Sequence, residues 1–452
     1  MRLKKLTLSN FRGFEQIEID FCDDFTVVAG VNGSGKSSLL RAISGIGSYL
    51  LPKITSAKKE AFSLTDADIY SGNLALSISA SFKTYEQMLY GQILRSKPDP
   101  EDVPKLIAER ESIRTKRRYT KKGSAEDINS EERLYVIEQL LKESEDYFSW
   151  QSEREEIRIG NPLIIHYSTK RVLSRLPTRL SKVQPLTPAN AYSNSLQEVG
   201  ISLNDFANWY RACENGLLGE EDFGLKLLQM LEVVIENMLP SFSALLLVDK
   251  PKPHFKIRKN NIQLELDQLS EGEKGILALA FDLTRRLTLA NPQSQNAIEA
   301  GFALVMIDEI ELHLHPKWQR QILKRLTSIF RNCQFIVTTH SPQVIGQAPA
   351  ENLRLLYLNE EKGKEKICAV TPYQSLGMDS SWVLQNIMNC PARDYETEQK
   401  LSAIFDEIDK NELVSARQKI TALSNEIGNF PDLQEASSLL DRLELLEAYE
   451  ED

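Results

Sequence analysis

The chain has 452 residues, and its 64 Asp and Glu against 54 Lys and Arg leave a formal net charge of −10. Residues 393–452 hold sixteen of these acids and only six of the bases, so this segment carries the whole net charge and residues 1–392 are neutral. A neutral body excludes a polybasic nucleic-acid coat as well as an acidic solvating protein. The length predicts roughly three domains.

Targeting and covalent features restrict the class of protein further. The five cysteines are never closer than 22 residues apart, which excludes a CxxC zinc motif and argues against a disulfide framework. The start, MRLKKLTLSNF, lacks the apolar core of a signal peptide, and no window approaches the run of about 18 apolar residues that suggests a membrane span. We therefore expect a soluble, cytoplasmic protein without a membrane partner.

The first part of the chain predicts strands around one helix, followed by an insertion. The pattern that supports this is period-two alternation, interrupted by a glycine-rich turn at 30–35. We expect strands over 3–8, 17–21, 25–29 and 74–82 and a helix over 37–46. Residues 84–159 are charged and follow a helical pattern, which predicts a solvated helical insertion.

Short apolar runs and helical periodicity alternate in the rest of the chain. Runs closed sharply by polar residues are typical of buried parallel strands. We expect buried strands over 162–167, 302–307 and 334–338, helices over 203–239 and short strands over 242–266. After residue 400, apolar residues at helical spacing predict three amphipathic helices with acidic outer faces, beginning near Leu401, Ile420 and Leu439.

One motif carries clear chemistry. Residues 30–37 fit G-x-x-x-x-G-K-[ST], with a predicted strand before the loop and a helix after it. Glycines let backbone N–H groups converge on phosphate oxygens, Lys36 would reach the β- and γ-phosphates, and the Ser37 hydroxyl would ligate Mg²⁺. The alternative is a chance glycine-rich turn, which the strand–loop–helix context disfavours. The candidate nucleotide-binding residues of this loop are Gly30, Asn32, Gly33, Ser34, Gly35, Lys36, Ser37 and Ser38.

Three further segments follow in order. Residues 269–275, LSEGEKG, open a helix; residues 304–309, LVMIDE, are four apolar residues and two acids; residues 335–341, FIVTTHS, form a strand that ends at a histidine. Each also has a purely structural interpretation. Ser270 with Glu273 could be only a helix capping box, the two acids an ordinary turn and His340 a structural histidine.

Taken together, these motifs resemble the head of an ABC-type ATPase, with Walker A, an LSGGQ-like signature, Walker B and a switch histidine. Residues 8–14 and 311–316 make the resemblance closest to the SMC, RecF and OLD branch, over roughly 1–83 and 160–375. The implied fold class is α/β: a P-loop ATPase head with a helical insertion and an acidic, all-helical C-terminal appendage. The expected domains are an N-terminal lobe at 1–83, the insertion at 84–160, a signature and Walker B lobe at 161–375 and a partner-docking region at 376–452.

The resemblance also implies roles for individual residues, with ATP and Mg²⁺ as cofactors. Asp308 would hold Mg²⁺ together with Ser37, Glu309 would polarise the attacking water, and His340 would sense the γ-phosphate; with Lys36, the last two are the expected catalytic residues. Ser270, Gly272 and Glu273 would bind ATP held by another subunit, which implies at least a head-to-tail dimer, because a group supplied in trans can stabilise the transition state strongly. Asn10 and Arg12 would lie near the phosphates, and Glu311 and His313 would occupy the dimer-facing D-loop.

The sequence leaves two assignments open, the Q-loop glutamine and a possible metal pair. The Q-loop glutamine of this fold cannot be placed, because Gln87 and Gln92 fall within the predicted insertion; the segment 166–171 is the alternative. His313 and His315 could form a metal pair, but alternate spacing in a loop is more typical of an interface.

A closer resemblance concerns the PtuA family of Septu and related retron antiphage systems. It rests on residues 307–319, residues 334–342 and an acidic helical tail after residues 380–384. This resemblance implies a small HNH nuclease as partner. Nuclease activity is not expected in this chain, since the tail lacks the pattern of a Toprim domain. The rival interpretations are an SMC- or RecF-like repair ATPase and a scaffold that holds ATP with little turnover.

Two surfaces suggest partners. A basic patch in the neutral body could bind DNA without sequence specificity, or could be a solvated helix paired with the acids at 126–146. Its members are Arg110, Arg114, Lys116, Arg117, Arg118, Lys121 and Lys122. The acidic tail is either a docking platform for a basic nuclease subunit or a folded appendage without a partner.

Overall fold

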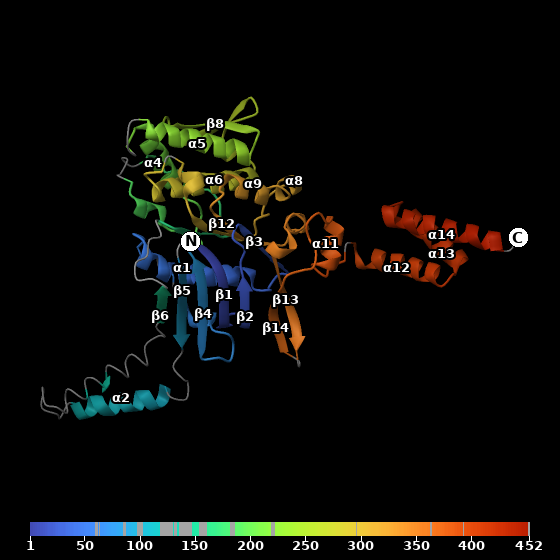
Figure 1. The fold of residues 1–452 in the computed structure, drawn as a ribbon, viewed down its shortest axis with the longest axis horizontal. Helices are drawn as coiled ribbons and strands as arrows, with labels where there is room; N and C mark the ends of the chain where they lie inside the picture. The colour runs from blue at the N-terminus through green and yellow to red at the C-terminus, as the bar shows by residue number, and fades with distance from the viewer. Residues whose placement is uncertain are drawn as a thin grey trace. The chain divides into compact units, whose positions relative to one another are not determined.

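The computed structural model of the chain divides into two compact units, residues 1–378 and residues 379–452, which are described separately (Figure 1). Within the described residues, no helix is long and apolar enough to cross a membrane. The structure describes all residues except 59–61, 63, 85–86, 97–102, 118–129, 131–132, 135–146, 153–160, 181–185, 218–221, 295, 362–363, 392 and 451–452.

The first unit is built around a six-stranded sheet of order β14-β13-β3-β12-β11-β7. All its neighbouring strands are parallel except the edge pair β13 and β14. Strands β11, β12 and β7 are buried at every residue, which explains their continuous apolar runs and confirms the expected buried strands. The bounds are β3 (Phe25–Gly30), β7 (Leu163–Tyr167), β11 (Ala303–Ile307), β12 (Gln334–Thr339), β13 (Leu353–Glu361) and β14 (Lys364–Val370).

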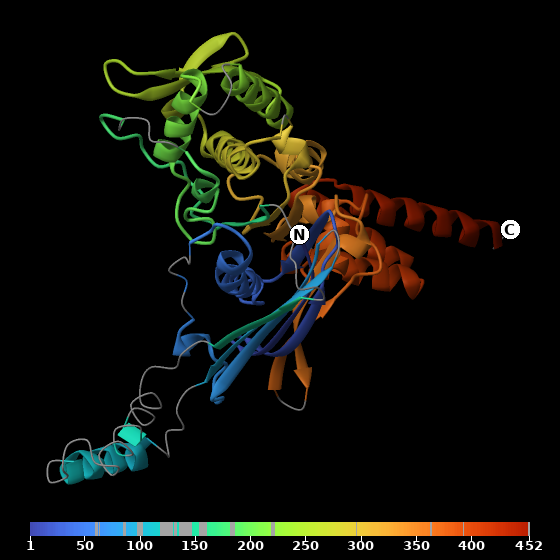
Figure 2. The same ribbon diagram turned by 60° about the vertical axis from the view of Figure 1, so that its left-hand side comes forward.

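A second, antiparallel sheet of order β2-β1-β4-β5-β6 alternates apolar and polar residues, and buries one face. Helix α1 (Lys36–Ile54) contacts strands of both sheets and lies against the second one in Figure 2. Because α1 meets a sheet on each side, twelve of its residues are buried, far more than the single stripe of a surface helix. The strands are β1 (Arg2–Phe11), β2 (Phe14–Asp20), β4 (Ala75–Lys83), β5 (Met88–Ser96) and β6 (Tyr147–Ser152).

Strands β5 and β6 correct the expectation of a helical insertion over 84–160. β5 pairs along the whole of β4, and β6 pairs with β5, so the ends of this segment extend the sheet. Strand β5 exposes apolar Tyr90 and Leu94 and buries Arg95, which concealed its period-two pattern. Between β5 and β6, helix α2 (Val103–Arg117) is helical as expected.

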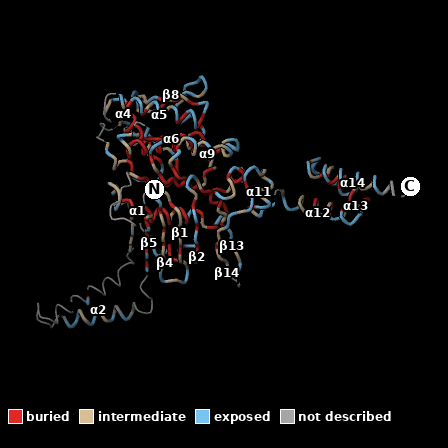
Figure 3. Tube along the Cα trace, in the orientation of Figure 1, coloured by how far each residue is buried: buried red, intermediate tan, exposed pale blue. Residues whose placement is uncertain are grey.

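The remaining part of the first unit packs helices and a small sheet of order β10-β9-β8 around an aromatic cluster. The rings of Phe206 and Phe281 stack with centroids 4.3 Å apart, and Phe255 lies 5.3 Å from Phe206. Buried residues concentrate in this region and in the central strands (Figure 3). The elements are α4 (Leu203–Glu214), α5 (Phe223–Met238), β8 (Phe242–Val248), β9 (His254–Lys259), β10 (Ile262–Glu265), α6 (Glu271–Ala290), α7 (Ala297–Ala300), α8 (Pro316–Gln319), α9 (Ile322–Ile329) and α10 (Pro342–Ile345).

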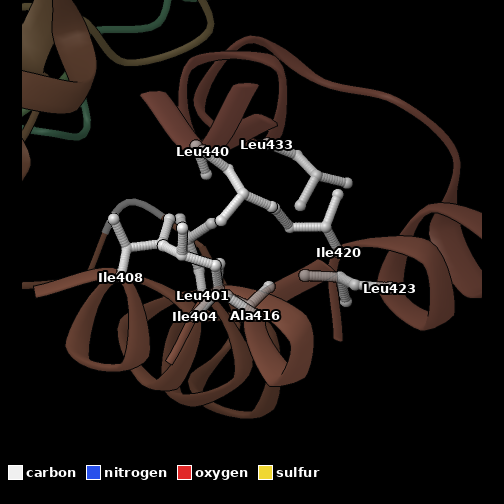
Figure 4. Close-up of a cluster of buried hydrophobic side chains, with 10 residues drawn as sticks. Leu401, Ile404, Ile408, Ala416, Ile420, Leu423, Leu433 and Leu440 are labelled. Carbon is white, nitrogen blue, oxygen red and sulfur yellow. The ribbon is translucent and has the colours of Figure 1, made fainter. Parts of the chain in front are cut away.

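The second unit contains the three predicted amphipathic helices, preceded by the short α11 (Ser380–Asn386). They are α12 (Tyr395–Asp409), α13 (Leu413–Ile427) and α14 (Pro431–Glu450). Their apolar faces meet in one core that includes Ile404, Ala416 and Leu440, all fully buried (Figure 4). The unit therefore has a hydrophobic core of its own, as an independent domain requires.

Candidate nucleotide site

The glycine-rich loop joins the end of β3 to the start of α1. Gly30, Gly33 and Gly35 have φ values of +156°, +82° and +92°. Two of these glycines are also needed for space: a Cβ on Gly30 would overlap the carbonyl oxygen of Leu356, and a Cβ on Gly35 would lie 2.5 Å from the Phe14 ring. The loop thus adopts the backbone conformation that only glycine permits here, as phosphate-binding loops before a helix N-terminus require.

Lys36 opens α1 and folds back over this loop. Its Nζ donates to the carbonyl oxygens of Gly30, at 2.8 Å, and Val31, at 2.9 Å. Burial lowers the pKa of Lys36 to about 8, although the nearby acids of residues 308, 309 and 311 oppose the shift. The ammonium group is thus held over the cradle by two neutral acceptors, which phosphate oxygens can replace.

Ser37 and Asp308 come together from elements that lie far apart in the sequence. The Ser37 Oγ donates to Oδ2 of Asp308 at 2.9 Å, and Thr338 on β12 donates to Oδ1. Two oxygen donors at the head of a phosphate loop are the ligands that Mg²⁺ prefers. In the same loop, Ser34 Oγ is buried without a hydrogen-bond partner among the described residues, as a ligand-facing hydroxyl would be. Asn32 is exposed and Ser38 is half-buried beside it.

Glu309 follows β11 in a turn with unusual backbone geometry. Its φ is +45°, which L-residues rarely adopt, and its N–H donates to Thr338 Oγ1 at 2.8 Å. Two residues on, Glu311 accepts the N–H of His340 at 2.6 Å, while its Oε2 is buried without a partner in the part of the chain that the structure describes. Burial, and then the charge of Lys36, lower the pKa of His340, so its neutral form prevails near pH 7.

The order of strands in the sheet shows where the segment 166–171 lies, which the sequence left as the alternative to a Q-loop glutamine. Because β7 lies parallel to β11, their carboxyl ends meet at one edge, and residues 168–171 lie beside the Walker B turn. Both glutamine candidates are elsewhere: Gln92 on β5 donates to Ser77 Oγ at 3.1 Å, and Gln87 accepts from Ser152 Oγ at 2.6 Å. The alternative segment is therefore the one that the fold brings to the site.

The signature segment begins α6. Ser270 is its N-cap, with a capping box: the Ser270 N–H donates to Glu273 Oε2 at 3.0 Å, while the Glu273 N–H donates back to Ser270 Oγ at 3.4 Å. Glu273 Oε1 pairs with Lys259 at 2.6 Å. Both carboxylate oxygens of Glu273 are thus engaged within the chain and position the helix start, and its expected contact with nucleotide stays a prediction. Gly272 packs directly on the carbonyl oxygen of His313.

Other predicted residues have structural partners. Arg12 lies in the β1–β2 turn, where its Nε bonds Asp68 Oδ1 at 2.7 Å; Arg41 of α1 bonds the same oxygen at 3.3 Å. Asn10 has φ +51° and accepts the N–H of Tyr70 through its carbonyl oxygen. The phosphate contacts expected of Asn10 and Arg12 stay predictions.

One of the two histidines considered for a metal pair has a structural partner. His315 Nδ1 accepts the Lys317 N–H and caps α8. Across the described residues, no group of three or more His, Cys, Asp or Glu side chains could hold a metal ion.

The predicted DNA patch is only partly described. Helix α2 contains Arg110, Arg114, Lys116 and Arg117, whereas Arg118, Lys121 and Lys122 lie outside the described residues. Glu109 on the same helix pairs with Arg133 at 2.8 Å, so this acid is neutralised by a base outside the patch.

A parallel sheet with a phosphate loop after β3, acids after β11 and a histidine after β12, together with a signature helix, defines an ABC-type ATPase. Residues 25–346 match the family described as AAA domain, putative AbiEii toxin, Type IV TA system, and the chain belongs to this family.

Relatives with retron and Septu names cover most of the chain. The Retron Ec83 probable ATPase of Escherichia coli is 30% identical over 433 residues, which cover 88% of this chain and 78% of that protein. The Retron Vc95 probable ATPase of Vibrio cholerae serotype O1 biovar El Tor is 27% identical over 409 residues, 79% of this chain and 73% of its own length. The Septu protein PtuA of Bacillus mycoides is 24% identical over 368 residues, 80% of this chain but 41% of that protein.

These relatives confirm the expected resemblance to PtuA-like ATPases.

The sequence did not predict two residues of the site. Thr338 is hydrogen-bonded to both Walker B acids, and Asp68 forms an ion pair with Arg12. Nothing in the sequence of β12 singled out Thr338, because a threonine inside an apolar strand is typical of β-structure.

Proposed function

We propose that the chain is the ATP-hydrolysing subunit of a bacterial antiphage defence complex, which gates a partner HNH-type nuclease through an ATP-dependent oligomeric state. The observation that carries the ATPase part is the meeting of Ser37 and Asp308 at 2.9 Å, which joins the phosphate loop to the Walker B acids. The defence role is supported by the retron and Septu names of relatives that match most of this chain.

The residues suggest how hydrolysis proceeds. Ser37 and Asp308 would hold Mg²⁺, which neutralises charge on the β- and γ-phosphates when it is bound. Lys36 exchanges its two carbonyl acceptors for phosphate oxygens. Glu309 accepts a hydrogen bond from the attacking water and polarises it, and His340, held by Glu311 through its backbone N–H, contacts the γ-phosphate. Catalysis here is mostly positioning and charge stabilisation.

A second copy would complete the site. Ser270 and Gly272 lie at the N-terminus of α6, where the helix dipole favours a phosphate. Gly272 contacts His313 of its own D-loop, so the signature and the D-loop would reach a partner as one rigid surface. ATP bound between two such heads couples its hydrolysis to their association, which makes a head-to-tail dimer the smallest working unit.

Glu309→Gln tests the enzyme. This variant keeps the shape of the side chain but loses its charge, so it should abolish ATP turnover and accumulate an ATP-bound oligomer, measured by phosphate release and by size-exclusion chromatography. Wild type and variant equally inert, even with DNA and the product of the neighbouring gene, would favour the scaffold that holds ATP without hydrolysing it.

The acidic tail is the proposed dock for the nuclease. Four of its six bases already pair with acids of the same unit, as Arg393 does with Asp432 and Lys419 with Glu407. Acids such as Asp406 and Glu435 remain exposed, beside exposed apolar residues that include Val414 and Leu446. This mixture suits a basic protein partner. A chain truncated at Ser380 that still copurifies the nuclease would exclude the tail as the dock.

DNA contact through α2 is a separate proposal. The seven bases of the patch, four of which lie on α2, would neutralise at most seven phosphates and give a salt slope no steeper than about −6. Replacement of Arg110, Arg114 and Lys116 by Ala should weaken binding equally for all DNA sequences and flatten the slope in a salt titration. Unchanged affinity and slope would remove α2 as the DNA contact.

A further inference from the structure

The loop after β7 carries a buried arginine to which the assignments above give no role. Arg171 is 7% exposed. Its guanidinium donates to three consecutive main-chain carbonyl oxygens: those of Asp308 at 2.5 Å, Glu309 at 2.6 Å and Ile310 at 3.3 Å. These three residues form the turn that presents the Walker B acids. One planar donor group therefore holds the whole turn from the β7 side.

The main-chain N–H groups of the turn are held by strands β12 and β7, which lie on either side of β11. Thr338 of β12 accepts the Glu309 N–H at 2.8 Å, and its own carbonyl oxygen accepts the Ile310 N–H at 3.0 Å. The Asp308 N–H donates to the carbonyl oxygen of Tyr167 at 2.8 Å. The N–H and C=O groups of residues 308–310 are therefore all hydrogen-bonded. Glu309 nevertheless keeps a left-handed φ of +45°. Such a conformation persists only where surrounding contacts enforce it.

The charge of Arg171 suits this place. Burial lowers the pKa of Arg171, but the carboxylates of Glu311, Asp308 and Glu309 oppose that shift and favour the charged guanidinium. Its N–H groups bond neutral carbonyls while its charge offsets three neighbouring acids. A lysine could supply the charge, but its ammonium is a single point and cannot span three carbonyl oxygens in a fixed plane.

We propose that Arg171 is a positioning residue for ATP hydrolysis, which aims the carboxylate of Glu309 at the attacking water by fixing the backbone of residues 308–310. The inference rests on the role proposed above for Glu309. It predicts that loss of the guanidinium slows the chemical step, because displacement of a catalytic group by about 1 Å can cost roughly 10²-fold in rate. It also predicts that ATP binding persists, since the phosphate loop does not depend on Arg171.

The test compares Arg171→Lys and Arg171→Ala with wild type. ATP affinity is measured by equilibrium binding, and single-turnover hydrolysis is measured separately. We expect both variants to bind ATP as wild type does and to hydrolyse it roughly 10²-fold more slowly. Guanidinium chloride, added well below denaturing concentrations, should restore part of the rate to Arg171→Ala, but none to Arg171→Ala combined with Glu309→Gln.

Arg325 provides the matched control. It too donates to two main-chain carbonyl oxygens, those of Asn237 at 3.1 Å and Met238 at 2.6 Å, in the helical part of the unit. Arg325→Lys should leave the hydrolysis rate unchanged. A change in rate equal to that of Arg171→Lys would mean that any arginine bonded to main-chain carbonyl groups has this effect, and would overturn the inference.

The other outcomes are equally decisive. Wild-type hydrolysis by Arg171→Lys, a parallel loss of binding and hydrolysis, or absence of rescue would each overturn the positioning role. If neither variant folds, Arg171 serves folding rather than hydrolysis, and the inference fails as well. Failure of the proposed function is distinguishable, because wild type would then be as inert as Glu309→Gln and would leave no hydrolysis rate for the Arg171 variants to lower.

Discussion

The backbone packed against Gly272 leaves no room for a side chain at this position. It lies in the first turn of α6, where alanine would suit the backbone and favour the helix. A Cβ on Gly272, however, would lie 2.4 Å from the carbonyl oxygen of His313 and 3.3 Å from its carbonyl carbon. Ordinary contacts lie at about 3.5 Å. Gly272→Ala must therefore move the signature helix away from the D-loop by about 1 Å.

The neighbouring carbonyl cannot easily yield. His313 already has a φ of +62°, so its peptide is constrained, and Glu311 upstream is bonded to His340. Because the signature and the D-loop would face a second subunit together, a shift of about 1 Å should lower ATP hydrolysis roughly 10²-fold. The assay is steady-state phosphate release at saturating ATP, with thermal unfolding measured in parallel.

Gly275→Ala is the matched control on the same helix. A Cβ on Gly275 would meet nothing within 4 Å, so this change should leave hydrolysis intact and stabilise the protein by up to about 1 kcal/mol through helix propensity. Equal activity of Gly272→Ala and Gly275→Ala would refute the argument that the contact with His313 aligns the signature.

Two further predictions concern stability, beside those made for Glu309 and Arg171. Burial alone would raise the pKa of Asp282 on α6, but the guanidiniums of Arg286 and Arg285 hold that pKa well below its usual range. Ionised Asp282 therefore contributes stability that is complete well above its unfolded pKa of about 3.9 and is lost as the pH falls below that value. Asp282→Asn should cost about 3–5 kcal/mol at neutral pH and flatten the acid dependence, measured by denaturant unfolding at several pH values; an unchanged acid dependence would contradict this assignment. Ile404→Ala removes a fully buried side chain of the C-terminal core and should cost about 2–5 kcal/mol in that unit while ATP hydrolysis by the first unit stays unchanged; equal loss of both would show that the units do not fold independently.

The phosphate loop, the Walker B acids and the signature were predictable because each is a local pattern. The strand before the loop, its glycines and the helix after it are contiguous in the sequence, so residues 30–37 indicate their own chemistry. The amphipathic tail was predictable for the same reason, since Leu401, Ile404 and Ile408 follow one helical period and do form one core. The expectation for 84–160 was wrong at its ends, because strand pairing with β4 is non-local and leaves only a weak signal in a polar segment.

The sequence by itself determined that this protein carries the phosphate-binding loop of an ATPase, because the fold can build a phosphate cradle from eight consecutive residues. Which side chains surround the Walker B turn was decided only by the tertiary structure. Arg171 and Thr338 reach residues 308–310 from more than 100 residues upstream and about 30 downstream, through strands β7 and β12 that flank β11 in the sheet. The order of parallel strands sets which loops share an edge, and one sequence does not encode that order in any local pattern.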